Sequence, residues 1–510
     1  MNTFAPTVQT PTPQFASPQE YAQPEYEITE EDRKRQKRIT AAWKAYDGEL
    51  DPPLQKTPEG LDPNVMTNQC GPVVDRGVDF LFGLELEIAV EENAPAEAQE
   101  MLDKIWGRKE ARLPLLQKLA MNGAMAGQAF LRIVPGNNGS YRLVAVDPSI
   151  VFVQTMPQDC ETVLLYCIEY CTDQRVHGQA NPQRVYYREE MKRLDPHDQW
   201  RGNDYDDEQE YENTTPDGID SDVTWQIQHW TRVGDRGPWI PAGEPIVWAY
   251  PFSPLFSCQN LPYPNKFWGK PDITPDVIGV NEALNLAQSC MNADVLFNGR
   301  PILYATGTGD QIIDIKPGKI IGLPLSESKI VAVPIGSDLA NTLKLTADLR
   351  SSIDEQTGTP GVATGRIADM PNGNLPGITV ELMFMALLKK TDKRRALYGE
   401  LIIDVSKALL VLSGMSDDVD ITLAWQNPLP SNSLEAAQTA VILQQLGISN
   451  TSLQRDLGRD PEEEARLKQT EDEQKLASVN KDFGPYPPEA LQIRIPDTRP
   501  VLPQQQGGQK

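Results

Sequence analysis

The sequence contains no stretch that is long and apolar enough to cross a membrane. None of its 510 residues belongs to a run of 18 consecutive apolar residues, about the minimum for a membrane-spanning helix. Residues 1–23 are rich in Pro, Gln and Thr, and they lack the charged start and the apolar centre of a signal peptide. We therefore expect a protein that neither enters a membrane nor carries a secretion signal.

Cysteine and histidine are scarce. The six cysteines are scattered over a long chain, which argues against a disulfide framework. Cys167 and Cys171 share one face of a predicted strand, but roughly 13 Å would separate them at the usual strand rise. We expect reduced, buried thiols rather than a disulfide or a metal site. The only histidines are His177, His197 and His229.

The motifs of common enzyme classes are missing. There is no G-x-S-x-G nucleophile elbow. Lys319 follows Gly318 as in a phosphate loop, but the upstream glycine is absent and Ile320 occupies the Ser/Thr position. Gly307-Thr308-Gly309 is too short for a dinucleotide fingerprint. We expect no catalytic residue, cofactor or metal site, and an unrecognised DNA-processing enzyme remains an alternative.

Positive charge is in deficit. Lys and Arg number 47 against 72 Asp and Glu, so the net charge is −25. Phosphate neutralisation supplies most of the affinity of proteins that grip DNA, and these proteins normally carry the opposite sign. The composition therefore disfavours a DNA-holding protein, but it is compatible with a protein past which DNA slides.

Residues 195–222 concentrate the negative charge. Asp204, Asp206, Asp207, Glu208 and Glu210 lie in its centre, in a spacing that does not match the calcium-binding loop. We expect a solvated loop, with an opportunistic cation site as the alternative.

The length corresponds to roughly three domains or subdomains. Residues 129–252 are predicted to form strands, since apolar and aromatic runs alternate there with Pro, Gly, Asn and Asp. Residues 300–336 have the pattern of a small β module. Further helices are expected at 28–46, 64–82, 432–446 and from Asp460 onward.

Three long helices are predicted, at 274–298, 337–356 and 378–413. In the first, apolar residues recur at intervals of three or four and form a single stripe. Thr274 is placed to cap it, with Pro275 at its first position. Residues 358–377 are rich in glycine and proline and have no periodicity, so an irregular loop is expected before the third helix.

Several segments, in consistent order over residues 30 to 475, resemble the portal proteins of tailed bacteriophages, especially the long-tailed type. The opening helix of that family is similar to Ala42–Gly48, its next segment to Val73–Gly83 and its stem entry to Trp268–Ile273. Its ending is similar to Leu446–Ser449 followed by Asp460–Glu464.

The resemblance implies an α+β portal fold with a mixed αβ wing, a two-helix stem, a small β-rich clip, a long wing helix and a helical C-terminal crown. The implied division is a disordered tail at 1–26, wing at 27–258, first stem helix at 259–299, clip at 300–336, second stem helix at 337–357, tunnel loop at 358–377, wing helix and strand at 378–430, crown at 431–480 and a disordered tail at 481–510.

The resemblance also implies a function. A dodecameric ring at one capsid vertex would let double-stranded DNA in during packaging, retain it and release it at ejection. The implied partners are the terminase large subunit, head-to-tail adaptor proteins, and the major capsid and scaffolding proteins. The implied location is the virion, after assembly in the host cytoplasm. The alternative in a different class is another virion adaptor or scaffold, although adaptors are usually much shorter and scaffolds lack a mixed αβ wing.

Within this plan the acidic composition suits a channel, because like charges repel phosphates over a Debye length of about 8 Å. Arg366, Asn372 and Asn374 are our hypothetical DNA-facing residues in the tunnel loop. The basic cluster of the long helix has two interpretations, a positive ring near packed DNA or, favoured, salt bridges to an acidic neighbouring subunit. Its members are Lys389, Lys390, Lys393, Arg394 and Arg395. The clip candidates are Lys316, Lys319 and Lys329.

Overall fold

The structure is a computed structural model. It describes residues 23–56, 60–91, 95–107, 109–136, 140–174, 182–194, 224–299, 303–306, 329–332, 339–366, 377–416, 419–429, 466 and 468. The chain divides into two compact units, Met1–Leu429 and Pro430–Lys510. In the second unit, only Arg466 and Lys468 are described, and both are helical.

The described strands form four sheets, and all of their pairings are antiparallel. The largest contains β4 to β9, in which β8 and β9 both pair with β7, and a smaller sheet has the order β10-β2-β3. Two further pairs are β1 with β13 and β11 with β12. The bounds are β1 Leu86–Val90, β2 Gln128–Pro135, β3 Tyr141–Val146, β4 Val151–Met156, β5 Asp159–Gln174, β6 Gln183–Leu194, β7 Thr224–Val233, β8 Ile240–Pro241, β9 Ile246–Trp248, β10 Leu255–Gln259, β11 Leu303–Thr306, β12 Lys329–Ala332 and β13 Ile421–Trp425.

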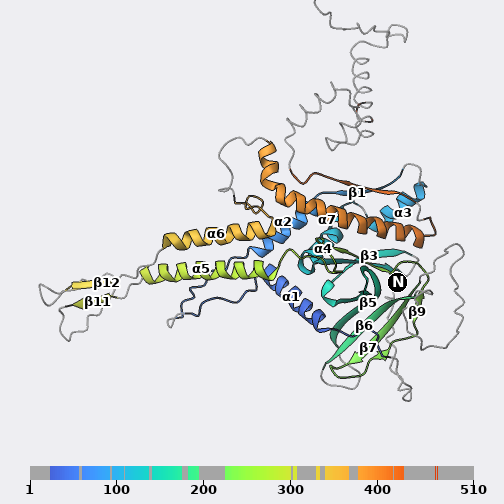
Figure 1. Cartoon of the computed structure of the whole chain (residues 1–510), viewed down its shortest axis with the longest axis horizontal. Coiled ribbons are helices and arrows are strands. Elements are labelled where there is room, and N and C mark those ends of the chain that lie inside the picture. The colour runs from blue at the N-terminus through green and yellow to red at the C-terminus, as the bar shows by residue number, and fades with distance from the viewer. Residues whose placement is uncertain are drawn as a thin grey trace, which may run out of the picture. The chain divides into compact units, whose positions relative to one another are not determined.

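In Figure 1, α7 lies between the β1–β13 pair and the larger sheets, whereas α5 and α6 extend away from all of these sheets. Their bounds are α1 Glu30–Asp47, α2 Cys70–Phe82, α3 Ala96–Trp106, α4 Lys109–Ala126, α5 Pro275–Gly299, α6 Leu339–Thr357 and α7 Gly377–Leu412, with a short 3-10 turn at Pro148–Ile150. Local chemistry fixes the ends of α1. Thr29 and Asp32 form a reciprocal capping box, and Gly48 ends the helix in the left-handed conformation.

Strand β2 separates two hydrophobic cores. Ala129, Leu131 and Ile133 face the larger core, which α2, α3, α4 and the second half of α7 build. Phe130 points the other way, into the core that covers one face of the six-stranded sheet. Alternation along a single strand therefore joins the helical layer to the sheet layer.

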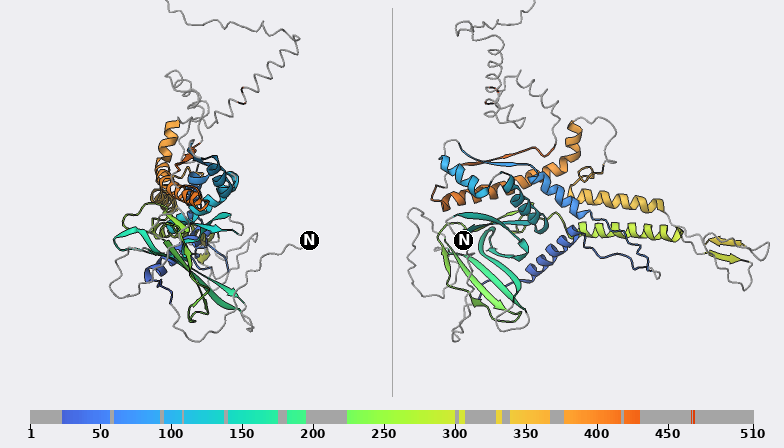
Figure 2. Two further views of the ribbon diagram at one scale, coloured as in Figure 1. Left: turned by 90° about the vertical axis from the view of Figure 1, so that its right-hand side faces the viewer. Right: turned by 180° about the vertical axis from the view of Figure 1, so that it is seen from behind.

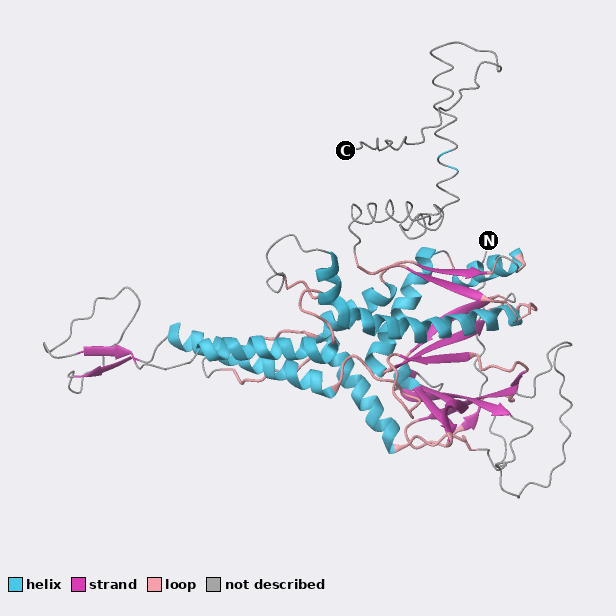
Figure 3. Ribbon diagram, turned by 45° about the horizontal axis from the view of Figure 1, so that its top comes forward, coloured by secondary structure: helices cyan, strands magenta, loops and turns pink. Residues whose placement is uncertain are grey.

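Helices α5 and α6 lie side by side and extend away from the sheets, as Figures 1 and 2 both show. In Figure 3, which separates helix from strand by colour, no strand of a larger sheet accompanies the outer part of this pair. The strands β11 and β12 stand between the two helices in sequence and pair with each other. The mixture of helices and antiparallel sheets confirms the expected α+β class.

The three long predicted helices are confirmed with bounds that shift by one or two residues, as α5, α6 and α7. The expected strand region is also confirmed, although β8 and β10 were not foreseen. The helix predicted at 64–82 is wrong in its first part. It begins at Cys70, because backbone N–H groups of the preceding residues donate to side chains of α5.

The disordered tail predicted at 1–26 extends too far. Glu25 and Tyr26 donate their backbone N–H groups to the Glu190 carboxylate, at 3.0 and 3.1 Å. The Tyr26 ring is buried against Phe152 and its hydroxyl donates to Asp32. An aromatic anchor thus attaches the start of the described chain to the six-stranded sheet.

The cysteine prediction is partly wrong. All six thiols are free, but only Cys70 and Cys167 are buried, whereas Cys171 and Cys290 are exposed. Cys171 is exposed because β5 continues past the part of the sheet that its core covers. The acidic segment 195–222, residues 307–328 of the expected β module, the helix predicted at 432–446 and the tail at 481–510 lie outside the described residues.

Candidate functional site: the junction of α5, α6 and α7

The entry into α5 is fixed by close backbone packing. Gly127 has a φ of 84°, and a Cβ there would lie 2.2 Å from the carbonyl oxygen of Gly269. Only glycine satisfies both conditions. Two residues before Thr274, the backbone N–H of Asp272 donates to the Ala124 carbonyl at 2.8 Å. These contacts set the position of the Asp272 side chain beneath α5.

Asp272 is a buried carboxylate that two cations of α7 hold. Its Oδ1 lies 3.1 Å from Lys390 Nζ and also pairs with Arg394 Nη2, and the Asp272 side chain has no exposed surface. Asn260 Nδ2 donates to the same oxygen at 3.3 Å. Burial alone would raise the pKa of Asp272, but the charges of Arg394 and Lys390 outweigh it and lower the pKa to about 2. The carboxylate therefore stays charged at neutral pH.

Lys390 joins the junction to the end of α6. Its ammonium group donates to the Thr357 carbonyl at 2.9 Å as well as pairing with Asp272. Thr357 is the last residue of α6, where the free carbonyls carry partial negative charge, so a cation is stabilising there. Burial lowers the pKa of Lys390, and the Asp272 carboxylate opposes that effect. One side chain of α7 thus binds the start of α5 and the end of α6.

Gly77 of α2 leaves room for the Arg394–Asp272 ion pair, because it has no side chain. A Cβ at Gly77 would lie 2.8 Å from Arg394 Nη1 and 3.3 Å from Asp272 Oδ2. One turn of α7 farther on, the hydroxyl of the fully buried Tyr398 donates to Asn260 Oδ1 at 3.3 Å. Burial raises the pKa of Tyr398 well above its ordinary value. The junction is therefore a closely packed polar centre inside a hydrophobic core.

The polar face of α5 binds the strap, which we define as residues 63–69. Strap N–H groups donate to α5 side chains of low exposure: Val65 to Ser289 Oγ at 2.9 Å, Thr67 to Asn285 Oδ1 at 2.9 Å and Gln69 to Asn281 Oδ1 at 3.1 Å. Two residues of extended chain advance about 6.6 Å and four residues of helix about 6 Å, so the two spacings match. The apolar stripe of α5 is evident in the sequence, whereas this polar stripe was not predicted.

Arg366 is attached to α6. Its guanidinium pairs with Asp354, and both side chains are about a quarter exposed. Its backbone N–H donates to the Gly361 carbonyl at 3.0 Å, within a series of turns that follows α6. The expected irregular loop therefore begins as compact turns against that helix, and Asn372 and Asn374 lie outside the described residues.

The basic cluster of α7 divides into two groups, and neither interpretation from the sequence included an internal pairing. Lys390 and Arg394 are directed into the junction. Lys389 and Lys393 are exposed, and Lys389 Nζ lies 3.9 Å from Asp392 Oδ2. Arg395 donates to the Gln426 carbonyl at 2.7 Å. The signal was available, since Lys390 and Arg394 fall on the buried helical stripe and Lys389 and Lys393 do not.

The remaining candidates are more isolated. Lys329 is exposed at the start of β12, whereas Lys316 and Lys319 lie outside the described residues. Among the described side chains, no group of three His, Cys, Asp or Glu residues is arranged to hold a metal ion. Within the same residues, no helix is long and apolar enough to span a bilayer.

Beyond the junction, the helix pair presents apolar side chains to solvent. Leu286 and Val295 on α5 are 44% and 58% exposed, and Leu343 and Leu345 on α6 are 58% and 49% exposed. Leu343 and Leu345 lie about 200° apart around α6, and Leu286 and Val295 about 180° apart around α5, so the exposed apolar side chains point to more than one side of the helix pair.

Comparison with known proteins identifies the family. The family model described as "Phage portal protein, SPP1 Gp6-like" matches residues 26–477. The chain therefore belongs to this family of phage portal proteins.

Solved structures also resemble the chain. One chain, in "Neck of native GTA particle computed with C12 symmetry", is 13% identical, with a TM-score of 0.40, over 83% of this chain and 99% of that one. Another, in "Virion of native gene transfer agent (GTA) particle", is 12% identical, with a TM-score of 0.44, over 83% and 94%. The search of the curated proteins found no match.

Proposed function

We propose that copies of this chain form a closed ring at one capsid vertex, through which double-stranded DNA is packaged, retained and ejected. The observation that carries the proposal is the set of exposed apolar side chains on α5 and α6, namely Leu286, Val295, Leu343 and Leu345. In a single subunit these side chains meet water, whereas in a head-to-tail ring each helix pair would have a neighbouring pair on both sides. A twelve-membered ring remains our expectation from the family resemblance.

In this ring α5 and α6 serve as the stem, and residues 300–336 between them as the clip. Residues 27–258 and 378–430 form the wing, and residues 358–377, with Arg366, form the tunnel loop. Residues 431–480 form the crown. The clip is the docking platform, first for the terminase large subunit and later for head-to-tail adaptors. The major capsid and scaffolding proteins surround the wing in the virion, after assembly in the host cytoplasm.

The charge balance supports passage of DNA rather than tight binding. Lys390 and Arg394, which the sequence suggested as DNA-facing or subunit-bridging, both pair internally with Asp272, which offsets one of their two charges. Arg366 forms an ion pair with Asp354, which offsets its charge. Fixed contacts between free cations and phosphates would raise affinity and slow the duplex. Internal pairing limits such contacts.

Electron microscopy of the purified full-length protein tests the proposal. We expect closed rings with an axial opening. In the same preparation, we expect no turnover of DNA or ATP. Particles without an axial opening, or nuclease or ATPase turnover that copurifies with the chain, would contradict the portal function and favour an adaptor or an enzyme.

A further inference from the structure

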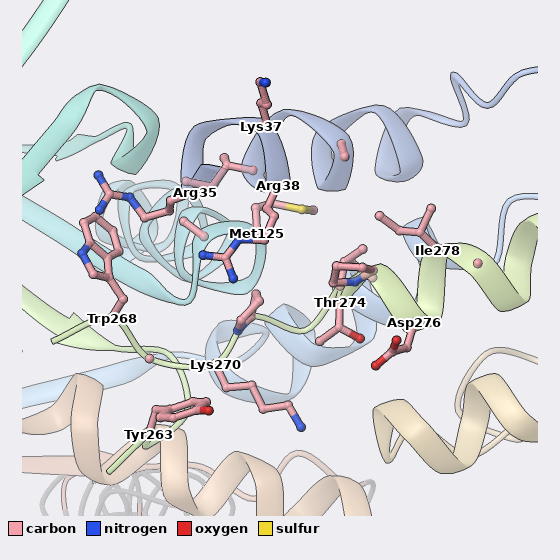
Figure 4. Close-up of a pocket in the computed structure, with 18 of the residues that line it drawn as sticks. Arg35, Lys37, Arg38, Met125, Tyr263, Trp268, Lys270, Thr274, Asp276 and Ile278 are labelled. Carbon is pink, nitrogen blue, oxygen red and sulfur yellow. The ribbon is translucent and has the colours of Figure 1, made fainter. Parts of the chain in front are cut away.

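A groove with a basic rim lies between α1, the segment 263–274 and the first turns of α5. Its volume is about 620 Å³. Figure 4 shows Arg38 pointing away from α1 into the groove, with Met125 close by. The apolar part of the lining includes Ile39, Met125, Ile273 and Ile278. The groove thus combines an apolar floor with cationic side chains.

The rim cations are available to a partner. Arg38, Lys266 and Lys270 are exposed. Among the described residues, Arg38 and Lys270 have no side-chain partner, and Lys266 contacts only the face of the Tyr263 ring, at 4.7 Å. Arg35, by contrast, is fixed by Asp32 and by the Trp268 ring and forms part of the wall.

Two carboxylates, Asp276 and Glu282, also line the groove, so it is not uniformly positive. The cations that line it are Arg35, Lys37, Arg38, Lys266 and Lys270. Because Asp32 offsets Arg35, four cations remain against two carboxylates, which is still a positive surplus in a chain whose net charge is −25. A partner must therefore be acidic, and the apolar floor requires that it also offer apolar or aromatic side chains.

Residues 195–222 have this composition. They contain eleven carboxylates against one arginine, and Trp200, Tyr205 and Tyr211 are interspersed among them. A DNA duplex would supply negative charge but no side chain to fill an apolar floor. An acidic peptide with aromatic anchors matches both parts of the groove.

Described residues on both sides of this segment line a cavity that shares a lining residue with the groove. Leu194 and Thr224, which flank it, pair at the ends of β6 and β7. The adjoining Arg193 and Trp225 line a second cavity of about 550 Å³. Lys266 lines both this cavity and the groove, so the two are neighbours.

We propose that residues 195–222 dock in this groove, with their carboxylates on the rim cations and their aromatic side chains on the apolar floor. The contact is made within a chain or between adjacent copies. It does not depend on the proposed ring, and ring formation is scored separately by microscopy.

Site-specific photocrosslinking in the full-length protein tests the docking. A benzophenone amino acid replaces Tyr263, which lines the groove and is 42% exposed. After irradiation, mass spectrometry should find crosslinks to peptides from residues 195–222, in monomer or dimer bands. The control places the same group at Tyr170, which is 48% exposed and lies outside the groove lining. Absence of crosslinks from Tyr263 to that segment would overturn the proposal.

A second experiment reverses the charges of the groove and measures the crosslink yield. The triple variant Arg38→Glu, Lys266→Glu and Lys270→Glu should lower the crosslink yield about tenfold, since each exposed pair contributes a few-fold. Reversing Asp206, Asp207 and Glu208 to lysine in the same chain should restore the yield.

The matched control reverses three exposed cations of α1 that lie outside the groove, Arg33, Lys34 and Lys44. It should leave the yield within about twofold. Equal losses in both triple variants would count against a specific contact.

A third experiment tests whether the groove binds the acidic peptide or nucleic acid. A variant with a neutral linker in place of residues 196–221 leaves the groove open. A labelled peptide of residues 195–222 should bind this variant in a salt-dependent manner, and it should bind the triple charge-reversal form of the variant about tenfold more weakly. Binding of a short DNA duplex without binding of the peptide would assign the groove to nucleic acid and refute the docking.

Discussion

The two ends of the α5–α6 pair differ in what their side chains contact. At the junction with α7, the buried Asp272 pairs with Lys390 and Arg394 of the same chain. Farther along the pair, Val295 and Leu343 are each 58% exposed to solvent. The first region stabilises one subunit by itself. The second is complete only when another molecule covers it, and the predictions below separate these two roles.

The largest expected effect on subunit stability comes from Asp272→Asn. The substitution leaves two cations buried without a counter-charge, which should lower the free energy of unfolding by about 3–5 kcal/mol. Urea unfolding, followed by tryptophan fluorescence, measures it. Lys389→Gln is the control, because that side chain is 75% exposed and its loss should cost less than about 0.5 kcal/mol. Equal losses of unfolding free energy in the two variants would show that the Asp272 ion pairs do not stabilise the subunit.

Acid should weaken the same contact. The folded pKa of Asp272 is about 2, below its ordinary value of 3.8. A depressed pKa gives stability that is present above the unfolded pKa and is lost as the pH falls from about 4 toward 2. The stability difference between the native chain and Asp272→Asn should therefore narrow by about 1 kcal/mol between pH 5 and pH 3. A constant difference over that range would show that the carboxylate charge does not stabilise the fold.

Gly123→Ala should destabilise the chain by about 1–3 kcal/mol, because the new Cβ would lie 1.9 Å from the Tyr398 hydroxyl, in a core with no room to move. Thermal unfolding measures the change. Gly279→Ala, on α5, is the matched control, since nothing lies within 4 Å of a Cβ there. That variant should be neutral or slightly stabilising, and a loss as large as that of Gly123→Ala would argue against steric packing as the cause.

Leu343→Ser should change the free energy of unfolding less than the other variants do. Its main effect should be on ring assembly. The side chain is already largely exposed, so the unfolding free energy of the subunit should change by less than about 0.5 kcal/mol. Closed rings should nevertheless become rare in electron micrographs. Asn341→Ser on the same helix, also exposed, is the control and should assemble normally. Rings formed normally by Leu343→Ser would place the subunit interface elsewhere.

Local signals made most of the fold predictable. Helical periodicity gave α5, α6 and α7 to within two residues, because each has a sustained pattern of apolar residues and a glycine, proline or polar residue near its ends. The short β8 escaped prediction because two residues carry no periodicity.

The junction could not be assembled from the sequence, since Asp272 and Arg394 are more than a hundred residues apart. A positional clue existed, because Arg394 follows Lys390 by one helical turn on the buried side of α7. The strap on α5 offered no comparable clue. Its backbone donors are invisible in a sequence, and its acceptors, Asn281, Asn285 and Ser289, look like an ordinary polar helix face.

A cryo-electron microscopy reconstruction of the purified full-length protein would show whether neighbouring copies cover the outer part of α5 and α6 around a shared axial opening. We expect a closed ring in which α5 and α6 of adjacent subunits pack together around the opening, with Leu343 buried between them. A reconstruction in which the helix pair points into solvent, away from any axis, would contradict it.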